Sequence, residues 1–541
     1  MSGSPDLVHG DTSPVLDVFV RDRQTGSTER VSVDSNGQQA NGGSGLFGLT
    51  ITPDGRFVAF YSEASNLVPG DTNGVADVFL RDRLAGTTER VSVDSSGMQG
   101  NGRADYPSIT PDGRFVVFQS DASNLVPGDT NGQTDIFLHD RLTGTTERIS
   151  ASSTGSQANS YSQVATLSAD GRFVAFYSLA SNLSGGDTAG HLDVFVRDRF
   201  TSTTEPVSVD ALGNLGNGHS SWPLISANGR YVSFVSAASN LVPGDTNGTW
   251  DVFVRDMQLG VTERVSVGPG GVQSNGDSLP PSISADGRFV AFFSNGTNLV
   301  PGISAGGVFV RNRRSGTTEY ASASTNGVQP NGSCELPSIS ADGRYVVFRG
   351  FASNLVPNDT NGLDDVFLHD RFASGFASIC DPGTNNVLAC PCGNPPSGSG
   401  RGCDNSSLTG GAALQADGIA YLSLDTLSFD TTGETSNATS ILLQGDALVP
   451  AGAVFGQGVR CAGGTLKRLF VKSAVNGGIQ APDLNAGDPT VSARSAQLGM
   501  PIQPGQPYAY LVYYRDPIVL GGCATSATFN VTQTGSLSWW P

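Results

Sequence analysis

A sequence pattern that returns about every 58 residues constrains this chain more than any other feature. Self-similarity at a fixed period means that each unit is one supersecondary module, which buries its faces only against its neighbours. One part of the pattern is the tripeptide DVF or DIF, which begins at Asp17, Asp77, Asp135, Asp193, Asp251 and Asp365, with a degenerate copy at 307–309. A second part, DGR or NGR, begins at Asp54, Asp112, Asp170, Asn228, Asp286 and Asp342. The fold is therefore a repeat architecture.

Each unit contains four short apolar runs, which one copy places at residues 106–110, 114–120, 135–140 and 146–152. Asp-Gly, Asn-Gly and Thr-Gly pairs separate such runs, and these pairs are hairpin and turn signals. The run at 56–62 is apolar on both faces, as expected of a strand in a sheet stacked between two others. Four-stranded sheets packed face to face around an axis form a β-propeller, so we predict an all-β fold of this kind.

The segment SITPDGRFVVFQS at 108–120 and its five sister copies resemble the WD40-like (PD40) repeats of TolB-like β-propellers. This resemblance implies a propeller over residues 1–378 and no particular activity, because propellers host unrelated functions. The first unit begins in the middle of a blade, since SPDLVHGDTSPVLDVFV aligns with ASNLVPGDTNGVADVFL. We therefore expect seven blade positions, the first without its inner strands. Six blades, with N-terminal strands that complete the last blade, are the alternative.

Residues 380–541 do not follow the repeat and are rich in Gly, Ala, Ser, Thr and Leu. Short alternating runs, such as 508–514 and 527–531, predict a compact β-sandwich. The segments CPCGN, VFGQGVRCAGG, YLVYYRDP and ATFNVTQTGSLSWWP resemble a C-terminal domain of large secreted proteins from environmental bacteria. That resemblance implies export and extracellular or surface display.

The formal net charge of −18 argues against a nucleic-acid partner, because phosphate contacts need basic patches. Only two basic residues are lysines, Lys467 and Lys472, and many arginines recur at fixed repeat positions. Arginine forms planar, bidentate pairs with carboxylates, so we expect ion-paired ladders between blades.

No apolar run is long enough for a membrane-spanning helix, and no signal peptide is visible. Because the chain begins in the middle of a blade, we expect that an upstream segment is missing from it. We predict an extracellular, cell-surface or periplasmic monomer.

Six of the seven cysteines cluster in the second domain. Zinc is one interpretation, but the Cys-x-Cys spacing at 390–392 is not that of a zinc knuckle, and no histidine lies in this region. We expect at least two disulfides, with Cys334 of the propeller outside them, and an oxidising compartment. The sequence leaves the pairing open among Cys380, Cys390, Cys392, Cys403, Cys461 and Cys523.

The DTNGxxD loops carry the candidate metal ligands. Two carboxylates and an amide oxygen surround a tight turn, and hard oxygen ligands at alternate positions suit Ca²⁺. The pattern resembles the calcium loops of integrin-type propellers, but it is two residues shorter and lacks the third acidic ligand. An Asn-Gly turn stabilised by its Asp side chains is the alternative. The candidate ligands are Asp71, Asn73, Asp77, Asp129, Asn131, Asp135, Asp187, Asp193, Asp245, Asn247, Asp251, Asp359, Asn361 and Asp365.

The blade-to-blade links, with the pattern GxQxNG, share a rim with the DTNG loops in a four-stranded antiparallel blade. Their Gln and Asn side chains, such as Gln99 and Asn101, are candidates for a ligand-binding ring or for bonds between neighbouring loops. His139 and His369 stand where other copies have Arg, so we interpret them as structural. Nothing in the sequence marks a catalytic triad or another catalytic residue.

We predict a secreted, non-enzymatic propeller that acts as a binding or display scaffold, with calcium as a candidate stabiliser. Its ligand, a protein or a carbohydrate, is expected on the face that carries the DTNG loops. Two alternatives come from other classes: a hydrolase or lyase of extracellular polysaccharide, and a TolB-like envelope scaffold that docks a lipoprotein.

Overall fold

The computed structural model is nearly all β, and it describes residues 2–4, 6–10, 15–185, 190–324, 327–371, 377–384, 386–417, 420–421, 424–425, 427–484, 486–519 and 527–539. The helical elements among these residues are a 3₁₀ turn, η1 (Pro269–Gly271), and one short helix, α1 (Val491–Gln497). None of the described helices is long and apolar enough to cross a membrane.

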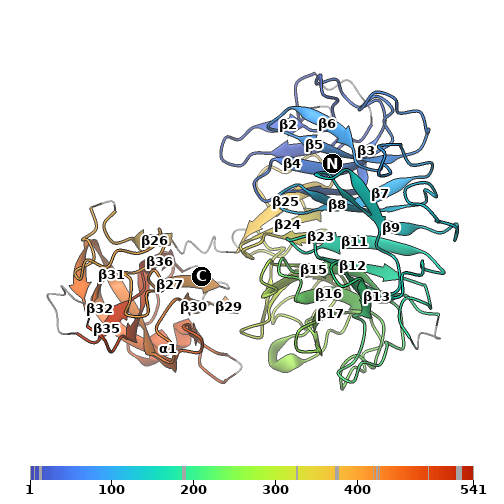
Figure 1. Ribbon diagram of the computed structural model, residues 1–541. Coiled ribbons are helices and arrows are strands. Elements are labelled where there is room, and N and C mark those ends of the chain that lie inside the picture. Colours follow the sequence, from blue (N-terminus) through green and yellow to red (C-terminus); the bar gives the residue numbers. More distant parts are fainter. Residues whose placement is uncertain are drawn as a thin grey trace. The chain divides into compact units, whose positions relative to one another are not determined.

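Seven antiparallel sheets follow one another through the described part of residues 19–370 (Figure 1). The first sheet pairs β1 (Phe19–Arg21) with β2 (Thr28–Arg30), and five four-stranded sheets follow it. The first two of these contain β3 (Ser44–Ile51), β4 (Phe57–Ser62), β5 (Asp77–Asp82) and β6 (Thr87–Arg90), and then β7 (Ala104–Ile109), β8 (Phe115–Ser120), β9 (Asp135–Asp140) and β10 (Thr145–Arg148). The other three contain β11 (Ser162–Leu167), β12 (Phe173–Ser178), β13 (Asp193–Asp198) and β14 (Thr203–Pro206); β15 (Ser220–Ile225), β16 (Tyr231–Ser236), β17 (Asp251–Asp256) and β18 (Val261–Arg264); and β19 (Ser278–Ile283), β20 (Phe289–Ser294), β21 (Gly307–Asn312) and β22 (Thr317–Tyr320). The last sheet contains β23 (Cys334–Ile339), β24 (Tyr345–Gly350) and β25 (Asp365–Asp370).

These sheets are the blades of a β-propeller, as predicted. The first sheet begins with the DVF strand, β1, so its two strands correspond to the outer two strands of a complete blade. Among the described residues, β1 and β2 form a sheet of their own.

The propeller core lies between sheets. All six residues of β4 are buried, which confirms that this run is covered on both faces. One apolar cluster joins Phe57 and Val78 of one blade to Val116 and Phe118 of the next. Because each sheet buries its second face on its neighbour, stacking stabilises every blade through apolar burial.

The described part of the second domain contains one large sheet and two small ones, in agreement with the expected all-β fold. Its larger sheet has the order β26 (Ala377–Cys380), β36 (Thr534–Ser538), β34 (Pro507–Arg515), β31 (Thr439–Phe455) and β32 (Gly458–Ser473), with β35 (Phe529–Val531) beside β34. The smaller sheets contain β27 (Ala413–Asp417), β30 (Ser428–Thr432) and β33 (Gln480–Ala481), and β28 (Ala420–Tyr421) with β29 (Leu424–Asp425). Phe429 of the smaller sheet stacks on Tyr510 of the larger one, with ring centroids 4.6 Å apart.

The strand that leads into the first cysteine of the second domain, β26, pairs within that domain's larger sheet. β26 pairs with β36 through Ala377 and Ser536, so residues 377 and 378 belong to the second domain's sheet. The pairing spans more than 150 residues of chain, and no local pattern reports it. A fourth strand of the last blade is not among the described residues.

At least two disulfides are present, as predicted, and they join Cys380 to Cys461 and Cys390 to Cys403. Cys392 is also disulfide-bonded. Cys523 lies outside the described residues. Cys334 is a buried thiol in β23.

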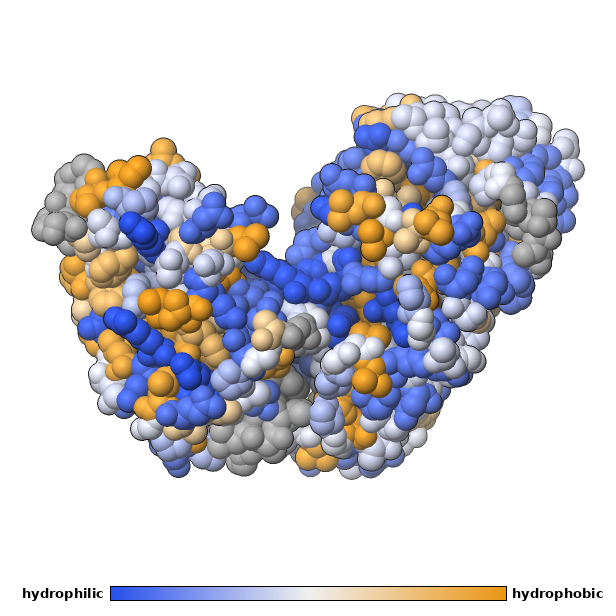
Figure 2. All heavy atoms as spheres, turned by 90° about the horizontal axis from the view of Figure 1, so that it is seen from below, coloured by the Kyte–Doolittle hydropathy of each residue, from blue (hydrophilic) through white to orange (hydrophobic). Residues whose placement is uncertain are grey.

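The surface seen in Figure 2 carries apolar side chains in small groups between hydrophilic ones. Among the exposed apolar residues, Leu84, Leu142 and Phe200 occupy equivalent hairpins between the third and fourth strands of successive blades.

Candidate ligand-binding site

The DTNGxxD loops connect the second and third strands of their blades, and their polar side chains bond within the loop and to neighbouring segments of the chain. Asn73 donates through Nδ2 to Asp77 Oδ2 at 2.8 Å and to the Gly100 carbonyl at 3.0 Å. The Ser92 hydroxyl donates to the other oxygen of Asp77 at 2.5 Å. Asn73 therefore turns its amide NH₂, not its oxygen, toward the carboxylate.

A guanidinium lies between the two carboxylates of this loop. Arg90 Nη1 is 3.2 Å from both Asp71 Oδ1 and Asp77 Oδ2. Arg264 lies 2.9 Å from Asp245 and 3.4 Å from Asp251, and Arg148 lies 3.5 Å from Asp129. Each arginine ends the fourth strand of its own blade.

These paired loops do not fit a calcium ion as they stand, because an arginine supplies the positive charge. No group of three or more His, Cys, Asp or Glu suited to a metal occurs among the described residues. Asn131 and Asn247 repeat the geometry of Asn73, donating to Asp135 at 2.8 Å and to Asp251 at 2.9 Å.

The loop of the last blade differs. Asn361 donates to Asp365 at 3.1 Å, but no ion pair within the described residues involves Asp359 or Asp365. The residue equivalent to Arg90 in this copy is Ser378, which lies in β26 and pairs with Gly535 of β36. Asp187 lies outside the described residues, and Asp193 accepts from the Ser208 hydroxyl at 2.7 Å. Calcium binding stays a prediction, with the Asp359 loop as its best candidate.

The Gln and Asn residues of the links bond loops together. Gln99 donates to the Thr72 hydroxyl at 2.7 Å, and Asn101 donates to the Ser123 hydroxyl of the next blade at 3.1 Å. These bonds favour the structural interpretation of the link residues.

His139 has the structural environment expected for it. Its Nδ1 is 2.9 Å from the Thr146 hydroxyl, and Arg81 makes the equivalent contact with Thr88 at 3.1 Å. Burial lowers the pKa of His139, so the ring is neutral near pH 7. His369 occupies the same position in β25, paired with Val346.

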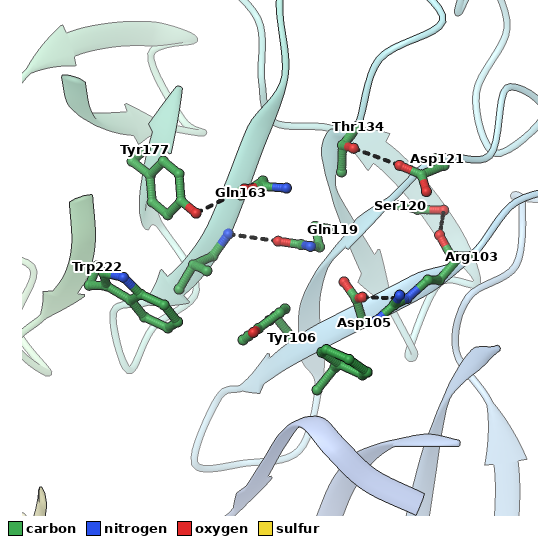
Figure 3. A pocket seen from close by; sticks show the side chains of 12 residues that line it. Arg103, Asp105, Tyr106, Gln119, Ser120, Asp121, Thr134, Gln163, Tyr177 and Trp222 are labelled. Atoms are coloured by element: carbon green, nitrogen blue, oxygen red, sulfur yellow. Dashed lines mark hydrogen bonds and ion pairs between the residues drawn. The ribbon is translucent and has the colours of Figure 1, made fainter. Parts of the chain in front are cut away.

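A cavity of about 270 Å³ lies at the innermost strands of four successive blades (Figure 3). Its residues come from the start of β7 and β11, the end of β8 and β12, and from β3 and β15. Ser120, the last residue of β8, pairs with the first residues of β7 and β9. The cavity therefore lies at the end of the strands where the DTNG loops connect β8 to β9.

A β-bulge in each innermost strand sends side chains into this space. The strand register shifts between Asp105 and Ser108 in β7 and between Ser221 and Leu224 in β15. Within these bulges Tyr106 has φ 48° and Trp222 has φ 52°, a left-handed conformation that bulky residues rarely adopt. Val164 of β11 has the same conformation, so the bulge belongs to the scaffold and the side chain varies from blade to blade.

Aromatic rings line one part of the cavity. Figure 3 shows Tyr106 and Trp222 directed toward one another, and their ring centroids are 6.0 Å apart at an interplanar angle of 71°. Phe47 meets the ring of Tyr106 at 6.4 Å. Gly48, at φ +106°, permits this approach, because a Cβ there would lie 2.8 Å from Tyr106 Cα. Phe47, Tyr106 and Trp222 all remain partly exposed.

Arg103 is held by its neighbours on two sides. Its guanidinium lies 4.1 Å from the Phe47 ring centroid and 5.3 Å from that of Tyr61, which are cation–π distances. Arg103 Nε is 2.7 Å from Asp105 Oδ2, but its N–H is not aligned for a hydrogen bond, so the contact is an ion pair. Burial raises the pKa of Asp105 to about 6, against the lowering effect of Arg103.

Amides and hydroxyls complete the lining. The Tyr177 hydroxyl donates to Gln163 Oε1 at 2.9 Å, and burial raises the pKa of Tyr177 to about 12. Gln119 Oε1 accepts from the backbone N–H of Val164 at 2.9 Å. Thr134 donates to Asp121 at 2.6 Å. The cavity therefore offers both hydrogen-bond donors and acceptors beside its aromatic rings.

Reasoning from the repeat missed this site, because its residues occupy the least regular positions of the pattern. The residues at the position of Arg103 in the other copies are Gly43, Tyr161, His219, Asp277 and Ser333. The residues at the position of Trp222 in other copies are Tyr106, Val164, Pro280 and Leu336. The departure from periodicity was itself the signal, since a ring of equivalent blades needs no unique Arg, Asp or Trp.

No protein-family model and no curated protein matches the chain. Solved structures similar to it are those of TolB-like and other β-propeller proteins. A putative TolB from Agrobacterium tumefaciens is 17% identical, with 52% of this chain and 80% of that chain covered and a TM-score of 0.32. An oligogalacturonate lyase in complex with manganese is 12% identical, with 65% and 82% covered and a TM-score of 0.41.

The β-propeller domain of the Trilobed protease from Pyrococcus furiosus is 12% identical, with 60% of this chain and 83% of that chain covered and a TM-score of 0.37. The propeller assignment of this chain rests on its own sheets, described above.

Proposed function

We propose that this protein is a secreted, non-enzymatic β-propeller that binds a ligand at the cavity between Arg103, Tyr106 and Trp222. The cavity itself supports this function most strongly, since it gathers non-repeated aromatic and charged side chains on an otherwise repetitive scaffold. A concave site with a few convergent polar groups is the usual form of a small-ligand site.

The disulfides Cys380–Cys461 and Cys390–Cys403 support export, because disulfides form and persist in oxidising compartments. We also propose calcium as a ligand of the loop with Asp359, Asn361 and Asp365, where it would stabilise the last blade.

The binding function is tested by probing a glycan array and a peptide array with the labelled full chain and with Trp222→Ala. We expect one array to show ligands that the parent binds and the variant does not. Ligands bound equally by parent and variant, with none lost, would place binding elsewhere and contradict the proposal.

A hydrolase or lyase of extracellular polysaccharide is the second candidate, and Asp105 is the observation that favours it. A buried carboxyl group with a pKa of about 6 is suited to general acid catalysis near neutral pH. This candidate predicts release of reducing ends or unsaturated products from polysaccharides, lost in Asp105→Asn. Ligand binding without product formation decides for the scaffold.

A further inference from the structure

We propose that the cavity binds a neutral carbohydrate, with Trp222 and Tyr106 as the walls that contact the sugar ring. This inference rests on the proposed binding function and specifies its ligand. Four features of the cavity limit the class of ligand that it can bind: its aromatic rings, its hydrogen-bonding groups, its charge and its size.

The aromatic geometry suits a ring-shaped ligand with apolar C–H faces. Tyr106 and Trp222 are not stacked on each other, because their planes meet at 71°, and neither ring is fully buried. An aromatic face is electron-rich and attracts the weakly positive C–H groups of a pyranose. The two rings already contact each other, and Tyr106 also contacts Phe47, so little ordering of the rings is required on binding.

The remaining lining suits hydroxyl groups, which both donate and accept hydrogen bonds. The Gln163 oxygen is occupied by the Tyr177 hydroxyl, which leaves its NH₂ group to donate. Asp121 offers a carboxylate acceptor at the exposed side of the cavity. A quaternary ammonium ligand, which aromatic cages also bind, has no acceptor for the hydrogen-bond donors of this lining.

Charge distinguishes a neutral sugar from an acidic one. Of the described residues that line the cavity, Arg103 is the one cation, and it is already paired with Asp105 at 2.7 Å. Asp121 adds a further negative charge. The cavity therefore disfavours the carboxylate of a uronic acid, because like charges repel.

The size of the site limits the length of the ligand. At about 270 Å³ the cavity lies just below the range of roughly 300–1,000 Å³ that is typical of drug-sized ligands. It is therefore expected to hold a monosaccharide or a disaccharide unit, such as the end of a longer glycan.

The test is calorimetric titration of the full chain with cellobiose, maltose, lactose and mannobiose, and with digalacturonate and choline. We expect at least one neutral disaccharide to bind. Trp222→Ala and Tyr106→Ala should each raise its Kd about tenfold or more, which corresponds to about 1.4 kcal/mol. Phe200→Ala, which removes an exposed aromatic ring on a distant hairpin, should leave the Kd unchanged.

Thermal melts check that each variant is folded, and Trp222→Phe supplies a milder change that should retain part of the affinity. Binding of digalacturonate or choline in place of the neutral sugars overturns the inference, as does sugar binding that survives both alanine changes. Peptide ligands lost in Trp222→Ala, without any sugar binding, overturn the carbohydrate inference and leave the binding scaffold standing. Absence of any ligand sensitive to Trp222 contradicts both.

Discussion

Arg56 forms a two-pronged ion pair with Asp82 across the end of its sheet. The Nη2–Oδ2 distance is 2.7 Å and the Nε–Oδ1 distance is 3.1 Å. This geometry joins the DGR turn to the end of the DVF strand in the same blade. The same pair recurs as Arg114–Asp140, Arg172–Asp198, Arg230–Asp256 and Arg344–Asp370. Arg199 extends the ladder between blades by pairing with Glu147 at 2.6 Å.

The repeated pair predicts a loss of stability in acid. Hydrogen bonds from the arginines lower the pKa of Asp82, Asp140 and Asp198 to about 2, from a usual value near 3.8. A lowered folded-state pKa stabilises the fold above the unfolded-state pKa, and this contribution is lost as pH falls from about 4 to about 2. We expect the melting temperature to fall across this window.

The matched variant changes Asp82, Asp140 and Asp198 to Asn. It should melt at a lower temperature than the parent at neutral pH and should depend less on pH between 4 and 2. Parallel pH profiles of parent and variant, measured by thermal melts, would show that the ladder contributes nothing.

Blade stacking predicts different costs for two glycine substitutions. Gly113 and Gly144 both have positive φ, +73° and +70°, so alanine is strained at either position by about 1–2 kcal/mol. A Cβ at Gly113 would also lie 2.4 Å from Phe57 of the preceding blade, whereas nothing lies within 4 Å at Gly144. Overpacking adds about 1–3 kcal/mol, so Gly113→Ala should lower the free energy of unfolding more than Gly144→Ala. Urea unfolding measures both, and equal costs would contradict tight packing between these blades.

Arginine occupancy predicts which loop responds to calcium. With a Kd of roughly 10⁻⁴–10⁻³ M, about 1 mM calcium should stabilise the native protein by about 0.4–1.4 kcal/mol through mass action. Asp359→Ala should abolish the shift in melting temperature between calcium and chelator. The equivalent change, Asp71→Ala, should leave it, because Arg90 already neutralises that loop. If the parent protein has the same melting temperature in calcium and in chelator, the proposal that it binds calcium is wrong.

The two disulfides should differ in their contribution to stability. They close loops of 81 residues, for Cys380–Cys461, and 13 residues, for Cys390–Cys403. Since a longer loop loses more entropy in the unfolded chain, replacing the first pair by alanines should cost about 4.5 kcal/mol and the second about 3 kcal/mol. Urea unfolding of the two double variants measures both losses of stability. A larger loss for the variant without Cys390–Cys403 would contradict the prediction. Peptide mapping of the unreduced protein verifies both links.

Much of the propeller could be predicted because its information is local and repeated. The run at 57–62 is apolar on both faces and became β4, with every residue buried. The Asp-Gly and Asn-Gly pairs marked turns whose glycines have positive φ, as at Gly113 and Gly132. Clustered cysteines likewise predicted disulfides, although not their partners.

The loop carboxylates show where a local pattern reaches its limit. The sequence spacing of the oxygen-bearing residues Asp71, Asn73 and Asp77 suits a metal ion. The sequence could not show that Arg90, at the end of another strand of the blade, places its guanidinium between those carboxylates. Strand pairing decides which charge reaches the loop.

The sequence by itself determined the blade, its strands and turns, and the disulfide-containing second domain, because periodicity and turn chemistry act over a few residues. Only the tertiary structure decided the candidate site. Tyr106 and Trp222 are distant in the chain and meet because stacked blades bring equivalent bulges to one place. Repetition reports what every blade shares, whereas a binding site arises where blades differ, and which differences meet depends on how the sheets pack.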